Sequence, residues 1–182
     1  MEFKIKNTKI IVQHGDILQL PVDAIVCPAT SDLWMAKGLA AEIVKRGGQA
    51  IADEAKSKSH SGFGDIVVTG AGTLPYKNIL HAVLIPRREE QIERRCFNKA
   101  VKNALVYAEN NNFKSIGFPM LGSAMAKVPY DMYAGLILRG AFEYFLQGSD
   151  SKLESVVFCL FDKDAYSSFA AQVNVLRQEF FI

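Results

Sequence analysis

The clearest strand of the sequence is Asp23-Ala24-Ile25-Val26-Cys27, a continuous apolar run bounded by turn residues. Such a run is typical of a strand that a sheet buries on both faces. Pro28-Ala29-Thr30-Ser31 follows it, and residues 38–46 then place Leu, Ile and Val at helical spacing before Gly47-Gly48. This succession predicts a central strand of an α/β fold.

The rest of the chain continues the alternation of strands and helices. Two short strands open it, a hairpin follows the first helices, and later strands are joined by long helices, which is the rhythm of an open, largely parallel sheet. The further strands are expected at residues 3–6, 9–12, 65–69, 79–84, 115–119 and 155–161, and the further helices at 51–58, 89–110, 130–147 and 164–180.

Composition limits the class of protein. The chain has 182 residues, of which 49% are hydrophobic and 22% charged, so we expect one domain spanning 1–182. A net charge of +2 is too small to indicate a counterion-driven nucleic-acid binder, so a nucleic-acid partner is possible but not indicated. The densest charge run, residues 87–95, alternates in sign and predicts a solvated helix face.

Metal, disulfide and membrane chemistry are not indicated. Cys27, Cys96 and Cys159 lie far apart without metal-ligand spacing, and we expect neither a disulfide framework, a metal site nor a cofactor. The N-terminus has no apolar signal core, and no apolar run is long enough to span a membrane. These features predict an intracellular protein, cytoplasmic or nuclear.

Candidate binding residues lie directly after the expected strands, because ligands of such sheets bind beyond the carboxyl ends of the strands. Asp16 could accept hydrogen bonds from an exocyclic amine or could simply be a turn residue. The helix start at Gly38 could hold a phosphate or be an ordinary capped terminus. Residues 119–126 are small enough for a close backbone approach, and Phe161 could stack on a base or lie in the core.

Common catalytic motifs are missing from the sequence. It has no Walker A loop, GxGxxG, GxSxG or HExxH, and its three histidines are scattered. Of these, His81 lies within an apolar strand and is expected in the core. Trp34 and Met35 are apolar residues in a loop that is expected to be exposed, which indicates a ligand wall or a partner contact.

Taken in order, six segments of the chain resemble the macro domain family. The resemblance implies a three-layer α/β/α sandwich with a mixed, mostly parallel sheet, and an ADP-ribose cleft at the strand ends. The segments are Gly15-Asp16-Ile17, Val22-Asp23-Ala24-Ile25-Val26-Cys27-Pro28-Ala29-Thr30-Ser31, Lys37-Gly38-Leu39-Ala40-Ala41-Glu42-Ile43, Gly64-Asp65-Ile66-Val67-Val68-Thr69, Phe118-Pro119-Met120-Leu121-Gly122-Ser123 and Val157-Phe158-Cys159-Leu160-Phe161-Asp162.

The resemblance also implies roles by position. Asp16 corresponds to the acceptor of the adenine amine, with the Ile17 backbone beside it, and Phe161 to the aromatic residue that stacks on adenine. The first phosphate loop contains Lys37, Gly38 and Leu39, and the second contains Gly122, Ser123, Ala124, Met125 and Ala126.

Departures from the family pattern concern catalysis. Members that hydrolyse ADP-ribosyl esters read Asn-Ala-Ala-Asn, where this chain has Cys27-Pro28-Ala29-Thr30, and Gly-Gly-Gly-Val, where it has Ala36-Lys37-Gly38-Leu39. The hydroxyl of Thr30 cannot supply both the donor and the acceptor of an asparagine amide. Another hydrolytic branch uses a lysine where Gly70 stands here.

Three hypotheses follow. The first is a non-catalytic module that binds ADP-ribose, free or attached to an ADP-ribosylated protein. The second is an ADP-ribosyl hydrolase with a non-standard catalytic set, for which Thr30 and Lys37 are the candidates. The third is a macro-fold interaction domain that binds another nucleotide, RNA or a protein through Trp34 and Met35.

Overall fold

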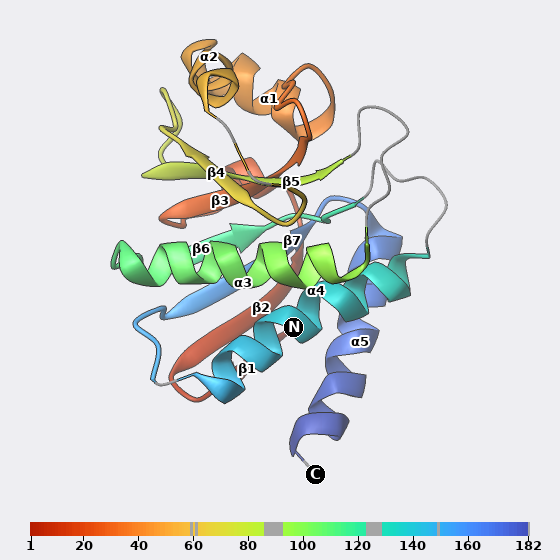
Figure 1. Cartoon of the computed structure of the whole chain (residues 1–182). Helices are drawn as coiled ribbons and strands as arrows, with labels where there is room; N and C mark the ends of the chain where they lie inside the picture. The colour runs from red at the N-terminus through yellow and green to blue at the C-terminus, as the bar shows by residue number, and fades with distance from the viewer. Residues whose placement is uncertain (59, 61, 86–92, 123–128, 149, 182) are drawn as a thin grey trace.

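The computed structural model contains a seven-stranded sheet between two layers of helices (Figure 1). It describes residues 1–182 except 59, 61, 86–92, 123–128, 149 and 182. The order of strands across the sheet is β1-β2-β7-β6-β3-β5-β4. The strands are β1 (Glu2–Ile5), β2 (Thr8–His14), β3 (Ala24–Thr30), β4 (Ile66–Thr69), β5 (Asn78–Ile85), β6 (Ser115–Phe118) and β7 (Ser155–Leu160).

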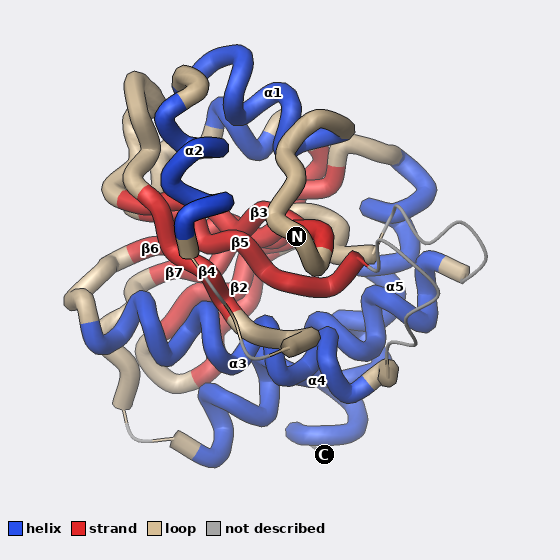
Figure 2. Tube along the Cα trace, turned by 45° about the horizontal axis from the view of Figure 1, so that its top comes forward, coloured by secondary structure: helices blue, strands red, loops and turns tan. Residues whose placement is uncertain are grey.

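The helices occupy both faces of the sheet (Figure 2). A short 3-10 helix, η1 (Ile17–Gln19), follows β2. The α-helices assigned in the described part of the chain are α1 (Gly38–Gly47), α2 (Ala50–Ser57), α3 (Arg95–Asn110), α4 (Tyr130–Gln147) and α5 (Lys163–Phe181). One layer consists of α1 and α2, and the other of α3, α4 and α5 (Figure 1).

The central five strands, β2, β7, β6, β3 and β5, run parallel, and β1 and β4 are antiparallel additions at the two edges. The carboxyl ends of the five parallel strands therefore meet at one edge of the sheet. This arrangement confirms the predicted α/β/α sandwich with a mixed, mostly parallel sheet.

The apolar run of β3 is buried on both faces, as predicted. Ile25 and Cys27 pack into the core beneath α1 and α2, whereas Ala24 and Val26 pack into the core beneath α3, α4 and α5. Alternation of side chains along a strand explains why one run serves both cores.

The predicted helix 89–110 begins later than expected. Residues 86–92 lie outside the described part of the chain, but Glu93 and Arg94 precede α3, which begins at Arg95. The first residue of α3 to enter the core is Phe97. Tertiary packing provides most helical stability, and Glu93 and Arg94 at the end of the charge run are exposed rather than packed. They are exposed loop residues rather than the predicted helix face.

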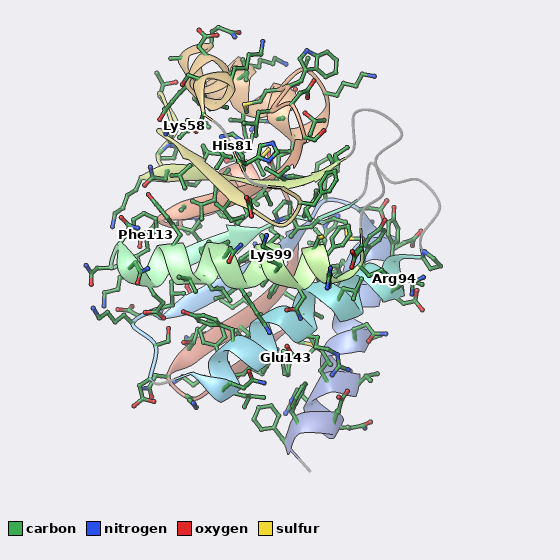
Figure 3. All side chains as sticks on the ribbon, viewed as in Figure 1. Lys58, His81, Arg94, Lys99, Phe113 and Glu143 are labelled. Atoms are coloured by element: carbon green, nitrogen blue, oxygen red, sulfur yellow. The ribbon has the colours of Figure 1, made fainter. Side chains whose placement is uncertain are left out.

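His81 is a core histidine, as predicted. It lies on β5, on the side of the sheet that carries α1 and α2 (Figure 3), and is fully buried. Its Nε2 lies 2.9 Å from Thr69 Oγ1. Burial, together with the positive charge of Lys58, lowers the pKa of His81 to about 4 against the opposing charge of Glu54.

This histidine is expected to make stability depend on pH. The unfolded chain takes up the proton below about pH 6.5 and the folded chain only below about pH 4, so the free energy of unfolding falls across that window. Urea denaturation of the wild type should show a loss of about 2 kcal/mol between pH 7.5 and 5 from this group. His81→Gln should lack this part of the slope, and His14→Gln, at an exposed position, should retain it. Equal slopes in both variants would contradict the assignment.

Candidate functional site

Strands β2 and β7 bring Asp16 and Phe161 to the same edge of the sheet. The Gly15 N–H donates to the Leu160 carbonyl over 2.9 Å, and His14 Nε2 lies 3.1 Å from the Phe161 carbonyl oxygen. Because a carbonyl oxygen only accepts, this ring nitrogen carries a proton. Two hydrogen bonds thus hold together residues that are about 145 positions apart in the sequence.

The Asp16 carboxylate is held by two donors. Its Oδ1 accepts from the Leu18 N–H over 2.9 Å, which caps η1, and its Oδ2 accepts from Arg46 Nη1 over 3.1 Å. Arg46 Nε in turn donates to Glu42 over 3.4 Å. The hydrogen bond to the Asp16 carboxylate raises the pKa of the Arg46 guanidinium, so Arg46 is charged at neutral pH.

The neighbouring residues present a backbone donor and an aromatic ring. The Ile17 carbonyl accepts from the buried Tyr76 hydroxyl over 3.0 Å, whereas the Ile17 N–H has no acceptor among the described residues. Burial first, and then the charge of Asp16, raise the pKa of Tyr76 to about 12, so the hydroxyl remains a donor. The Phe161 side chain is 82% exposed, which leaves its ring free to stack. Asp16, Ile17 and Phe161 are called the Asp16 end below.

An apolar groove adjoins the Asp16 end. It has a volume of about 350 Å³ and runs from Gly15 and Asp16 over β2 and β7, between those strands and residues 19–22. Its further lining includes Ile11 and Val157. The Asp16 carboxylate thus lies at a concave surface rather than on a flat one.

The start of α1 presents uncapped backbone donors. Gly38 has φ +57°, which favours glycine, and the N-cap residue Lys37 makes no side-chain capping bond. The first N–H groups of a helix have no partner within it and attract anions. Because α1 rises about 1.5 Å per residue, Gly38 and Arg46 lie about 12 Å apart, so this helix reaches from its first N–H groups to the Asp16 carboxylate.

The predicted second phosphate loop, which lies after β6, begins at Gly122, a buried residue with φ +99°. A Cβ at this position would lie 2.7 Å from Tyr133 Cε1 and 2.9 Å from Phe97 Cε1, so only glycine fits. Ser123, Ala124, Met125 and Ala126, the rest of the predicted second phosphate loop, lie outside the described residues. Gly38 and Leu39, at the start of α1, are called the glycine end below.

The two catalytic candidates both contact Trp34. Thr30 Oγ1 accepts from the Trp34 N–H over 2.8 Å and donates to the Trp34 carbonyl over 3.3 Å. Lys37 is exposed, with its Nζ 5.9 Å from the centre of the Trp34 ring. The donor of the Thr30 hydroxyl is therefore used within the loop.

The expectation that Trp34 and Met35 are both exposed is wrong. Met35 is 7% exposed and Leu33 beside it 3%, so both belong to the core beneath α1 and α2, and Trp34 is half-buried. The bond from the Trp34 N–H to Thr30 turns the chain back toward the sheet and buries these side chains. Met35 cannot provide the partner contact predicted for it.

Sequence reasoning missed Arg46 and Tyr76. Both reach the Asp16 end from positions without a binding motif, and no local pattern marks them. The terminal turn of α1 is held by the loop after β4, where Thr73 Oγ1 donates to the Arg46 carbonyl over 2.9 Å. Only the folded arrangement places the guanidinium next to Asp16.

Two absences apply to the described part of the chain. No helix there is both long and apolar enough to cross a membrane. No cluster of three or more His, Cys, Asp or Glu side chains suited to a metal ion occurs among the same residues.

The sequence profile described as Macro domain matches residues 26–137. The chain belongs to the Macro domain family. A protein of Pyrobaculum aerophilum, named only as uncharacterized, is 33% identical over 93% of each chain. The Macro domain chain is also 30% identical to a Salmonella newport protein named O-acetyl-ADP-ribose deacetylase, over 90% of this chain and 93% of that one.

Solved structures agree with the fold of this Macro domain. A variant of the Oceanobacillus iheyensis macrodomain with ADPR matches with a TM-score of 0.87 at 19% identity, and covers 98% of both chains. The Trypanosoma brucei macrodomain in complex with ADP-ribose matches with a TM-score of 0.80 at 22% identity, over 90% of this chain and 68% of that one. At these identities the matches establish the arrangement of strands and helices.

Proposed function

We propose that this Macro domain, spanning residues 1–182, binds ADP-ribose, free or attached to protein, and does not hydrolyse it. The proposal rests on the hydrogen bonds and the exposed ring of the Asp16 end. Asp16 offers a positioned acceptor for the adenine amine, the free Ile17 N–H a donor for the neighbouring ring nitrogen, and the exposed Phe161 ring a stacking surface.

The glycine end suits the diphosphate. The uncapped N–H groups of Gly38 and Leu39 are donors that need no side chain, and the close packing at Gly122 fixes the start of the second loop. Lys37 is exposed and can swing from Trp34 to pair with a phosphate oxygen. The Asp16 end and the glycine end are separated by about the length of α1. They can therefore bind the adenine and the diphosphate of one molecule.

The contacts of Thr30 favour binding over hydrolysis. Its hydroxyl hydrogen is used by the Trp34 carbonyl, so Thr30 cannot donate to a distal ribose without breaking the loop contact. General-base catalysis needs a group within hydrogen-bond reach of the attacking water. The Thr30 hydroxyl already donates its hydrogen to the Trp34 carbonyl, and the Lys37 side chain lies over the Trp34 ring, so neither contact provides such a base.

Calorimetric titration with ADP-ribose, ADP and AMP tests the proposal. We expect a micromolar Kd for ADP-ribose, weaker binding of ADP and still weaker binding of AMP, because each truncation removes contacts beyond the Asp16 end. A folded protein that binds none of them would overturn the proposal. The favoured hypothesis would then be an interaction domain that binds another nucleotide, RNA or a protein through Trp34 but not through Met35.

A hydrolase is the second candidate, favoured by the 30% identity to the protein named O-acetyl-ADP-ribose deacetylase. Incubation with O-acetyl-ADP-ribose or with a mono-ADP-ribosylated protein separates the two functions. We expect no product above the spontaneous rate. Turnover that is lost in Thr30→Val would instead establish a hydrolase in which the Thr30 hydroxyl takes part.

A further inference from the structure

A cation lies beside the carboxylate of the Asp16 end. Arg46 Nη1 lies 3.1 Å from Asp16 Oδ2, and the two side chains are 40% and 31% exposed, respectively. The contact is therefore open to a ligand rather than buried beneath the surface. A base that reaches the Asp16 carboxylate also meets the Arg46 guanidinium.

Both groups retain unused hydrogen-bonding capacity. A guanidinium has five N–H donors, and among the described residues Arg46 uses one toward Asp16 and one toward Glu42. A carboxylate has about four acceptor positions, and Asp16 uses one toward Leu18 and one toward Arg46. With the free Ile17 N–H, the Asp16 end offers both donors and an acceptor side by side.

We infer that Arg46 determines base specificity and lets the site accept 6-oxopurine nucleotides, with hypoxanthine or guanine, in addition to adenine. The inference rests on the proposed function. Adenine would donate its 6-amine to Asp16 and accept from the Ile17 N–H at N1. A 6-oxopurine would lie one hydrogen-bonding position away from the place of adenine. Its O6 would accept from Arg46, and its N1–H would donate to Asp16.

The charge of Arg46 is what makes the second arrangement favourable. An isolated carboxylate repels the carbonyl oxygen of a 6-oxopurine and leaves it without a donor, and such a mismatch of base edge and side chain costs about 10- to 100-fold in affinity. The guanidinium supplies the donor and offsets the negative charge. Removing Arg46 should therefore affect the 6-oxopurine more than adenine.

The test is the ratio of two dissociation constants, for the hypoxanthine analogue of ADP-ribose and for ADP-ribose itself. In the wild type we expect the ratio to lie within about tenfold of one. In Arg46→Met we expect it to rise at least tenfold, chiefly through weaker binding of the hypoxanthine ligand. Arg46→Lys, which keeps the charge but has fewer donors, should lie between them.

Lys45→Met is the matched control, since Lys45 is the adjacent cation of α1 and also pairs with Glu42, at 3.7 Å. It should keep the wild-type ratio, and thermal melting should show that all variants fold. A ratio in Arg46→Met within threefold of the wild type would overturn the inference while ADP-ribose binding stands. Failure of the wild type to bind either ligand would overturn the proposed function, and the inference with it.

Discussion

Asp16→Ala is expected to weaken ADP-ribose binding by at least tenfold. A hydrogen bond to a charged group contributes about 1.5–3 kcal/mol, which corresponds to roughly 10- to 150-fold in Kd. The substitution also releases Arg46 and the Leu18 N–H, the two groups that hold the carboxylate in place. Calorimetric titration at one salt concentration measures the change.

Two further variants serve as controls for the loss of affinity expected in Asp16→Ala. Asp16→Asn keeps one acceptor oxygen and should lose less affinity than alanine. Asp53→Ala removes an exposed carboxylate from α2 and should bind as the wild type does. Unchanged affinity in Asp16→Ala would show that the base does not lie at Asp16.

Gly122→Ala is expected to reduce both affinity and stability. The new methyl group would lie within 3 Å of the rings of Tyr133 and Phe97, which are buried and pack against each other with centroids 5.2 Å apart. The backbone at φ +99° is also unfavourable for alanine. Since the rings cannot move apart, the backbone must shift, at about 1–3 kcal/mol of unfolding free energy.

The affinity loss in Gly122→Ala should be at least tenfold, because the shift displaces the start of the second phosphate loop. Gly135→Ala on α4 is the matched control, since its Cβ would approach no closer than 3.6 Å to Gln172. Alanine in a helix interior stabilises by about 0.5–1 kcal/mol relative to glycine, so this variant should melt later and bind normally. Wild-type affinity in Gly122→Ala would exclude this loop from the site.

Most of the fold could be predicted because its signals are local. The apolar run of β3 is bounded by turn residues, and α4 was expected at its observed residues, 130–147. The sequence predicts too early a start for α3, because alternating charges at helical spacing resemble a helix face. Which residue first touches the core, here Phe97, depends on the packed structure and not on the charge pattern.

Of the candidate residues, those that directly follow paired parallel strands could be expected to lie together. Asp16 and Phe161 lie at one edge because β2 and β7 end there side by side, which is a property of the topology. Arg46 and Tyr76 reach Asp16 and Ile17 through tertiary contacts across 30 and 59 positions, which no sequence pattern encodes. Met35 was misplaced because a loop can bury an apolar side chain when its backbone turns inward.

The pairing of β2 with β7 determines when the site can form during protein synthesis. Lys9 of β2 is aligned with Ser155 of β7, so the second strand of the chain obtains its parallel neighbour only from its last strand. Until β7 has left the ribosome, the nascent chain carries β2 with an open edge, which is a template for unwanted pairing with other chains. Binding thus arises only after β7 has been synthesised, and a chaperone that shields the β1–β2 hairpin would protect the growing polypeptide until then.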